Sequence, residues 1–199
     1  MLKSCFFHNL IEAGCDEAGR GSLAGPVAAA AVILPKNFKH PVLNDSKKLT
    51  IKQREQLRDE ILDSAVAWNV AFIDNNEIDE LNILRASIKA MHNAIEGLKK
   101  EPKFLLIDGN SFFPYKDIEY RTIVKGDGLY FSIAAASVLA KVFRDEYMKK
   151  IHEEFPQYGW STNKGYATSF HRKAILKYGI TPYHRRTFTL TDTQMTLEF

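Results

Sequence analysis

Short apolar runs, separated by polar and glycine-rich segments, predict five strands along the chain. The run at residues 10–15 indicates a short first strand, and glycines follow it closely. Residues 27–34 form a continuous apolar run, which predicts a strand buried on both faces and ended by Pro35. Three further runs predict strands at residues 68–73, 104–107 and 121–124.

Helical patterns occupy the stretches between these strands. Thr50 and Gln53 form a capping-box pattern, so we expect a helix to begin near Ile51. Apolar residues then recur at steps of three and four, which predicts one long helix with a single core stripe. The stripe consists of Leu81, Leu84, Ile88, Met91, Ile95 and Leu98.

The last third of the chain is predominantly helical in its pattern. A helix rich in small residues is predicted over 132–151, Pro156 breaks the pattern, and shorter helical signals lie between residues 168 and 182. We find no internal repeat and no low-complexity linker, so we expect this part to pack onto the sheet. The predicted divisions are a core over 1–150, a helical appendage over 151–190 and a flexible tail over 191–199.

The composition favours one domain, or one domain with an appendage. The chain has 199 residues, of which 45% are hydrophobic, enough to bury a substantial core. Its two cysteines, Cys5 and Cys15, cannot form a disulfide framework, and Cys15 alternates with strand residues as a buried thiol does. There is no signal-peptide pattern and no apolar run long enough to span a bilayer, so we expect a cytoplasmic protein.

Positive charge is concentrated in one part of the chain. Residues 141–186 contain ten Lys or Arg and four acidic residues, a net charge of +6, whereas the whole chain carries +3 and the remainder therefore −3. Six aromatic residues are interleaved with these bases, which suits phosphate neutralisation combined with stacking on sugars or bases. The alternative is a solvated helical face with core aromatics.

Acidic residues stand at the ends of three predicted strands. Asp16 and Glu17 follow the first strand, and Asp108 and Asp127 follow two later ones. Binding sites in open α/β sheets lie at the carboxyl edge of the strands, so we expect these four carboxylates to converge there. Taken alone, an Asp-Glu pair is more often a solvated acidic turn, and Asp108 before Gly-Asn is also typical of a turn.

Clustered carboxylates indicate a divalent metal centre. Adjacent carboxylates raise one another's pKa unless a cation or hydrogen-bond donors hold them, and their hard oxygens suit Mg²⁺ or Mn²⁺. Four such groups would hold two cations, and two metals about 4 Å apart activate a water and neutralise charge that grows on a phosphate. The expected reaction is therefore phosphodiester hydrolysis.

Six separated motifs occur in order along the chain. They are Asp-Glu-Ala-Gly-Arg-Gly-x-Leu-Ala-Gly-Pro-Val from Asp16, Asn-Asp-Ser-Lys-Lys-Leu from Asn44, Ile-Asp-Gly-Asn from Ile107, Lys-Gly-Asp from Lys125, Ser-Ile-Ala-Ala-Ala-Ser-Val-Leu-Ala-Lys-Val-x-Arg-Asp from Ser132 and Asn-Lys-Gly-Tyr from Asn163. Over residues 11–188 the chain closely resembles bacterial ribonuclease HII. The resemblance implies a ribonuclease H-like α/β fold, in which helices flank a mixed central sheet and a helical C-terminal appendage clamps the duplex.

The resemblance also implies an activity. The expected enzyme is an endonuclease that hydrolyses the RNA strand of RNA/DNA hybrids and cuts on the 5′ side of a ribonucleotide embedded in DNA, leaving 3′-hydroxyl and 5′-phosphate ends. Its ligands for two Mg²⁺ or Mn²⁺ ions would be Asp16, Glu17, Asp108 and Asp127. The nucleophile would be a metal-activated water.

Substrate-reading residues follow from the same resemblance. The backbone of Gly19, Arg20 and Gly21 would contact the ribonucleotide's 2′-hydroxyl, which suits a loop of bare amides and carbonyls, while Tyr166 would pack beside the next deoxyribose. Expected phosphate contacts are Lys47, Lys48 and Lys164. Each lysine alone is typical of a solvated side chain, and the glycines alone could simply make a tight turn. Asn163 stands where many relatives have histidine.

Three other interpretations have less support. Gly19, Gly21 and Gly25 faintly mimic a dinucleotide-binding fingerprint, but Pro26 and the apolar run after it predict a strand where that fingerprint needs a helix. Ribonuclease HIII usually carries an added N-terminal substrate-binding domain, whereas Asp16 is almost at the start here. A catalytically silent hybrid-binding module is disfavoured by the intact acids. We assign no chemistry to Ser132, Ser137, His171 or His184.

The last six residues resemble the bacterial sliding-clamp-binding pattern Gln-x-x-Leu-x-Phe. Gln194 would supply hydrogen bonds, and Met195, Leu197 and Phe199 would be apolar anchors in a pocket of the clamp. Such a tail would become ordered on binding its partner. Short patterns also arise by chance, so a frayed end or a cloning remnant is the alternative. We expect the protein to be a monomer.

Overall fold

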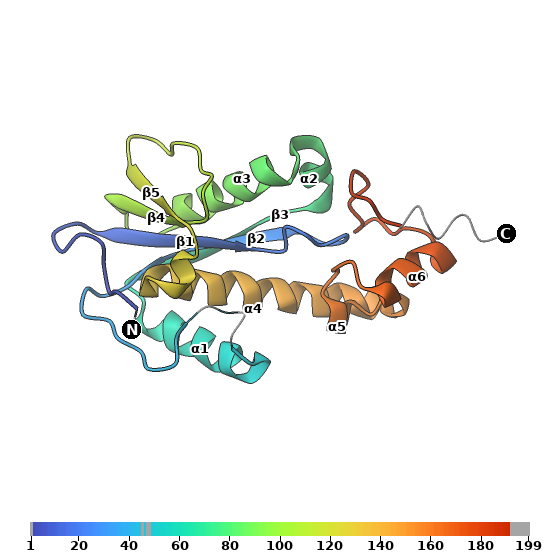
Figure 1. Cartoon of the computed structure of the whole chain (residues 1–199), viewed down its shortest axis with the longest axis horizontal. Coiled ribbons are helices and arrows are strands. Elements are labelled where there is room, and N and C mark those ends of the chain that lie inside the picture. Colours follow the sequence, from blue (N-terminus) through green and yellow to red (C-terminus); the bar gives the residue numbers. More distant parts are fainter. Residues whose placement is uncertain (1, 45, 47–48, 192–199) are drawn as a thin grey trace.

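A five-stranded mixed sheet forms the centre of the computed structural model, which describes residues 2–44, 46 and 49–191. In chain order the strands are β1 (Glu12–Ala18), β2 (Val27–Ile33), β3 (Ala67–Ile73), β4 (Phe104–Asp108) and β5 (Glu119–Ile123). Their order across the sheet is β3-β2-β1-β4-β5 (Figure 1). The β1–β2 and β2–β3 pairs are antiparallel, whereas β1–β4 and β4–β5 are parallel.

The five predicted strands are all present, with ends that differ by at most three residues. Every residue of β2 is buried, as the continuous apolar run predicted. This burial follows from the layers, because helices cover both faces of the sheet: α3 (Ile83–Glu96) packs on one face and α4 (Phe131–Glu154) on the other (Figure 1). The remaining layer is α1 (Ile51–Ser64), which packs against α4.

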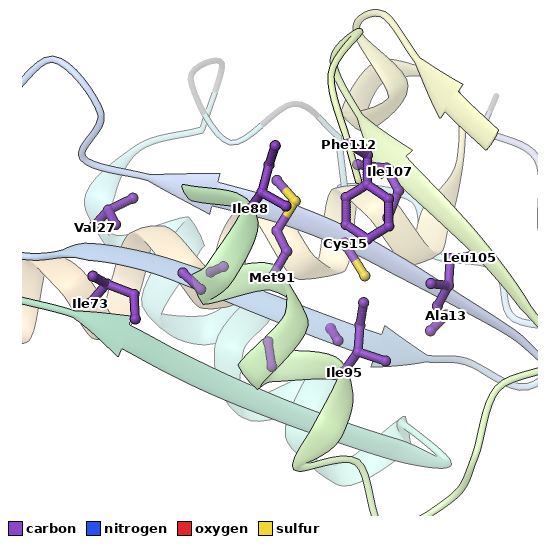
Figure 2. Close-up of a cluster of buried hydrophobic side chains, with 14 of the residues drawn as sticks. Ala13, Cys15, Val27, Ile73, Ile88, Met91, Ile95, Leu105, Ile107 and Phe112 are labelled. Atoms are coloured by element: carbon purple, nitrogen blue, oxygen red, sulfur yellow. The ribbon is translucent and has the colours of Figure 1, made fainter. Parts of the chain in front are cut away.

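Alternation along β1 separates its core residues from its site residues. Ala13 and Cys15 belong to the core on the α3 side, together with Met91 and Ile95 (Figure 2). Successive side chains of a strand point to opposite faces, so Gly14 and Asp16 face α4. The strand therefore buries an apolar pair beneath α3 and directs a carboxylate toward α4.

The predicted capping box is present at the start of α1. The Thr50 hydroxyl accepts from the Gln53 amide, and the Gln53 side chain accepts from the Thr50 amide, so the helix begins at Ile51 as expected. The predicted small-residue helix is α4, which begins at Phe131 and ends at Glu154, before Pro156. Cys15 is a buried free thiol, also as predicted, and Cys5 is a half-buried free thiol.

The prediction of one long helix over the apolar stripe is wrong. Two helices occupy this stretch, α2 (Asn75–Leu81) and α3, and they meet at Asn82, whose φ is +67°. The Asn82 side chain accepts hydrogen bonds from the amides of Leu84 and Arg85, so it ends one helix and caps the next. Two residues of the expected stripe do not follow the prediction: Leu84 is exposed, and Leu98 lies beyond the end of α3.

The C-terminal segment packs against the end of α4 rather than against a face of the sheet. It contains a 3-10 turn, η3 (Pro156–Tyr158), and two helices, α5 (Trp160–Asn163) and α6 (Ser169–Tyr178). Its core joins these elements to Met148 and Ile151 of α4 and to Leu23 and Ala24 of the loop after β1. The expected division at residues 150 and 151 falls inside α4. Across the described residues, no helix has the length and apolar character needed to cross a membrane.

We expect Gly14→Ala to lower the free energy of unfolding by about 3 kcal/mol, near the upper end of the usual cost of overpacking. The added Cβ would lie 2.3 Å from the Ser132 carbonyl carbon of α4, and backbone cannot yield as a flexible side chain can. Gly128→Ala is the matched control, since its Cβ would meet nothing within 4 Å. Urea unfolding measures both, and equal stability of the two variants would contradict the close packing of α4 on β1.

Candidate active site

Two strand ends bring Asp16 and Asp108 together. The parallel pairing of β1 with β4 places Cys15 opposite Ile107, so the next residue of each strand, Asp16 and Asp108, lies at the same edge of the sheet. Leu106 packs against Ile133 of α4, and Asp108 lies two residues further along the strand, so its side chain faces α4 as Asp16 does. The predicted convergence at the carboxyl edge therefore holds for these two residues.

Burial dominates the environment of Asp16. The residue is only 6% exposed, and its pKa is raised well above the usual value by burial first and then by the nearby charges of Glu17 and Asp108. Hydrogen bonds from the Ser137 hydroxyl and from the Glu17 amide, the latter 2.7 Å long, oppose the rise. Ionisation of Asp16 is therefore unfavourable in this site, and a nearby cation would stabilise the ionised form.

Asp108 connects the strand ends to the segment that carries Asp127. The Gly126 amide donates to Asp108 Oδ1 over 2.7 Å, and Asp127 is buried in the 3-10 turn η2 (Gly126–Gly128) just before α4. A Cβ at Gly126 would lie 2.6 Å from Ile133 Cδ1 and 3.3 Å from Asp108 Oδ1. Glycine at this position therefore permits the close approach.

Glu17 lies at the same edge and pairs with Arg20 at 3.2 Å. Within the described ranges, no three His, Cys, Asp or Glu side chains are already grouped as a metal site. The donor set nevertheless fits a hard divalent cation, because it consists of carboxylate oxygens and because burial and mutual repulsion destabilise the uncompensated charge on Asp16.

Sequence reasoning missed Ser137, which links Asp16 to the next loop. Its hydroxyl lies 2.9 Å from that of Ser46, and Ser46 and Leu49 in turn accept from Arg54 through their carbonyl oxygens, at 3.0 and 2.7 Å. Arg54 thereby fixes both ends of the segment 46–49. The one sequence feature that could have indicated this role is the position of Ser137, a polar residue directly after the buried alanines of α4. Lys47 and Lys48, the expected phosphate contacts, lie outside the described residues.

The glycine loop and Tyr166 lie side by side. Ser22 forms an antiparallel bridge with Tyr166, and the Leu23 amide donates to the Gly165 carbonyl over 2.7 Å. Gly19 is buried with a φ of +96°, Gly21 is exposed, and Tyr166 is 37% exposed. The expected substrate-reading segments, far apart in sequence, thus share one surface.

A buried histidine pair supports the backbone of Tyr166. His171 Nδ1 lies 3.0 Å from the Tyr166 carbonyl oxygen, while His171 Nε2 accepts from Trp160 and lies 3.2 Å from His184 Nε2. The Thr181 amide donates to His184 Nδ1. These partners assign both rings as neutral, with His184 donating to His171 and His171 donating to Tyr166. They have structural roles, consistent with the absence of any assigned chemistry.

Lys164 and Asn163 stabilise the turn before Tyr166. Lys164 is largely buried, which lowers the pKa of its amine, and Nζ donates to the Ser161 carbonyl over 2.5 Å. The Asn163 side chain donates to the Tyr158 carbonyl and accepts from the Gly165 amide, at 2.7 and 2.8 Å. Asn163 therefore orders the turn through its side-chain amide.

Three solved structures that are similar to this chain are ribonucleases H. The ribonuclease H2 from Pyrococcus horikoshii OT3 is 26% identical with a TM-score of 0.77, over 90% of this chain and 94% of that chain. The ribonuclease HII in the PCNA:RNase HII complex from Archaeoglobus fulgidus is 25% identical with a TM-score of 0.77, over 92% and 96%. Bst-RNase HIII in complex with Mn²⁺ shares the fold at 17% identity and a TM-score of 0.70, over 92% and 68%. The fold and the acidic edge thus define a nuclease of the ribonuclease H class.

The sequence comparisons narrow the class. The profile of the family described as Ribonuclease HII matches residues 13–191. Ribonuclease HII of Bacteroides thetaiotaomicron is 60% identical over 200 residues, which is 100% of both chains. The chain belongs to the ribonuclease HII family, and it is an endoribonuclease that acts on RNA paired with DNA. Both the predicted family and the predicted fold are confirmed.

The histidine pair makes stability depend on pH. Burial and then the neighbouring His171 lower the pKa of His184 from 6.5 to about 4. Between pH 6.5 and 4, His184 is therefore protonated in the unfolded chain but neutral in the folded chain. The contribution of His184 to the free energy of unfolding is complete above pH 6.5 and is lost as the pH falls toward 4. Between pH 7.5 and 5, wild type should lose about 2 kcal/mol more unfolding free energy than His184→Gln. Urea titrations at both pH values measure the difference, and parallel losses would contradict a neutral buried pair.

Proposed function

We propose that Asp16, Glu17, Asp108 and Asp127 are the metal ligands and catalytic residues of this endoribonuclease. The observation that carries the proposal is the buried Asp16 carboxyl, held against two other carboxylates at the sheet edge of a ribonuclease H fold. Asp127 follows Gly126, whose amide donates to Asp108, and this proximity supports its inclusion in the same site. Intact acids at all four positions also argue against a silent binding module.

Asp16, Glu17 and Asp108 each have a hydrogen-bond or ion-pair partner that orients the carboxylate. Ser137 and the Glu17 amide donate to Asp16, the Gly126 amide donates to Asp108, and Arg20 pairs with Glu17. Two Mg²⁺ or Mn²⁺ ions would lower the pKa of the attacking water and neutralise charge growing on the phosphate. The bound Mn²⁺ in Bst-RNase HIII supports a divalent cofactor. The protein's own contribution is to hold the carboxylate oxygens of these acids in place before substrate binds.

The loop of Gly19, Arg20 and Gly21, together with Tyr166, reads the ribonucleotide. The exposed Gly21 leaves room for close approach to the backbone, and the 2′-hydroxyl is the group that distinguishes RNA from DNA. Tyr166 packs beside the following deoxyribose. Cleavage then occurs on the 5′ side of an embedded ribonucleotide and leaves 3′-hydroxyl and 5′-phosphate ends.

The appendage over residues 151–190 clamps the duplex as part of a monomer. Its basic residues neutralise phosphates, and Lys164, Lys47 and Lys48 are the proposed contacts. The Lys164 amine must leave the Ser161 carbonyl to reach a phosphate, so its contribution is smaller than that of an exposed lysine.

The two free thiols and a substrate that forms on chromosomal DNA support a cytoplasmic location.

Asp16→Asn and Asp108→Asn should each lower kcat by more than about a hundredfold, beyond the usual effect of losing a residue that only supports a metal ligand. Binding of an uncleaved duplex should persist, because the basic appendage is unchanged. Asp127→Asn should cause a strong but partial loss. Single-turnover cleavage of a duplex with one ribonucleotide, at saturating Mg²⁺ and separately Mn²⁺, measures these effects and identifies the preferred metal.

Asp63→Asn on the exposed face of α1 is the matched control for these substitutions and should leave cleavage unchanged. If Asp16→Asn or Asp108→Asn cleaves at the wild-type rate, the acids are not the catalytic residues. If duplex binding falls as far as cleavage does, the acids serve substrate binding or the fold instead.

Tyr166→Ala should depress cleavage at a single ribonucleotide more than it weakens binding of an all-DNA duplex. The ring supplies a sugar-packing surface of the kind worth about 1–3 kcal/mol per stacked group, or up to about a hundredfold in rate. Tyr120→Ala is the control, because Tyr120 has nearly the same exposure, 36%, but lies on β5. Equal losses in cleavage and binding would reduce Tyr166 to a packing residue.

The sliding clamp is the proposed protein partner. A ribonuclease HII from Archaeoglobus fulgidus has been solved in complex with PCNA, which supports clamp binding for this family member. The proposed contact is the segment from Gln194 to Phe199, which lies outside the described residues. Its sequence supplies one hydrogen-bonding side chain and three apolar anchors.

Deletion of residues 194–199 should eliminate binding to the clamp from the same organism and leave cleavage of short oligonucleotides unchanged. Surface plasmon resonance with immobilised clamp measures the first and a fluorescent cleavage assay the second. Exchanging Thr196 and Glu198 for alanine is the control, since these positions are free in the pattern. Absence of binding by the full-length protein at tens of micromolar, far weaker than a specific interface of this kind, would end the proposal.

A further inference from the structure

Two buried arginines hold five of the eight backbone carbonyls of the loop that follows β1, residues 19–26. Arg144 of α4 and Arg185 of the C-terminal segment are both 0% exposed. Within the part of the chain that the structure describes, their side chains donate six hydrogen bonds, all to backbone carbonyl oxygens and none to a carboxylate. The acceptors are Gly19, Arg20, Ala24, Gly25, Pro26 and Lys164.

Arg185 sets the direction of the two peptide units proposed to read the substrate. Its Nη2 donates to the Gly19 carbonyl over 2.7 Å and its Nη1 to the Arg20 carbonyl over 2.8 Å. In a planar trans peptide the carbonyl of one residue and the N–H of the next point in opposite directions. With both carbonyls turned inward to Arg185, the N–H groups of Arg20 and Gly21 are turned outward.

The outward amides have no hydrogen-bond acceptor within the described part of the chain. A Cβ built on Gly21 would meet no atom within 4 Å. The loop therefore presents two adjacent donors at an exposed position next to Tyr166, to which Ser22 is bridged. Such donors match the oxygen of a 2′-hydroxyl, whereas a deoxyribose offers no acceptor there.

Arg144 fixes the same loop relative to Tyr166. Its guanidinium donates to the carbonyls of Pro26 at 2.9 Å and Lys164 at 3.0 Å, and its Cζ lies 5.5 Å from the centre of the Tyr166 ring. Gly19 rests directly on this side chain, because an added Cβ would lie 1.9 Å from Arg144 Nε. One rigid group thus spans both segments of the reading surface.

Stability alone does not account for two such arginines. Burial disfavours the charge of both side chains, and neutral carbonyls compensate it only in part. A planar guanidinium does, however, present donors in a fixed fork, which holds several carbonyls at set angles as a flexible ammonium cannot. Two buried guanidinium groups therefore fix the geometry of the loop, although burial of their charges is unfavourable for the stability of the fold.

We propose that Arg144 and Arg185 are positioning residues for ribonucleotide discrimination, acting by holding the amides of Arg20 and Gly21 outward beside Tyr166. Being buried, neither touches the substrate. This inference rests on the proposed reading role of the loop. It adds the source of the discrimination, which lies in two buried residues whose side-chain hydrogen bonds all end on backbone carbonyls.

The test compares Arg185→Lys and Arg144→Lys with Arg85→Lys, an exposed arginine on α3. Each variant keeps its charge, but each buried one loses the fork. For both buried variants, kcat/KM on a duplex with a single ribonucleotide should fall by about tenfold to a hundredfold, as expected for losing hydrogen bonds from a charged group. Affinity for an all-DNA duplex and for Mn²⁺ should stay at wild-type values. Arg85→Lys should match wild type throughout.

Several outcomes would overturn the inference. Wild-type kcat/KM in both lysine variants would show that the fork is not needed, and equal losses of cleavage, DNA affinity and Mn²⁺ affinity would show a role in the fold as a whole. Unfolding of either lysine variant below the assay temperature would likewise show a role in the fold as a whole. If wild type itself cuts no faster at a ribonucleotide than at a deoxyribonucleotide, the proposed function fails instead, before any variant is considered.

Discussion

The parallel pairing of β1 with β4 beneath α4 is the interaction on which the site depends. It places Asp16 beside Asp108 at one edge of the sheet, and the missing side chain of Gly14 allows α4 to approach closely enough to bury Asp16. Burial raises the pKa of Asp16, and neighbouring carboxylates raise it further. The fold therefore stores an unfavourable charge where a divalent cation would relieve it, a common way in which active sites give up stability for function.

A second constraint governs the surface beside the acids. The loop after β1 and the turn around Tyr166 have little regular structure, yet several of their backbone carbonyls are hydrogen-bonded by Arg144, Arg185 and His171 from elements distant in sequence. Loops held in this way keep a defined geometry on a rigid scaffold, which the proposed reading of a single hydroxyl would require. The acids and the reading surface share α4, since it supplies both Ser137 and Arg144.

Much of the fold was predictable because local patterns determined it. The apolar run of β2, the capping box at Thr50 and the break at Pro156 each act over a few residues. The single long helix failed because one side chain, Asn82, caps a new helix within an unbroken apolar stripe. The convergence of Asp16 with Asp108 was predictable from strand ends. The roles of Ser137, Arg144 and Arg185 were not, because their partners are mostly backbone groups or side chains brought near only by the tertiary fold.

Thermal unfolding of wild type and Asp16→Asn at pH 8, each with and without Mn²⁺, tests the stored charge most directly. Without a divalent cation the variant should unfold at the higher temperature, because the repulsion among buried carboxylates is gone. Mn²⁺ should raise the unfolding temperature of wild type and leave that of the variant unchanged, since a cation stabilises only the state that binds it. A wild type already as stable as the variant without cation, or an equal gain from Mn²⁺ in both, would contradict a metal centre built on Asp16.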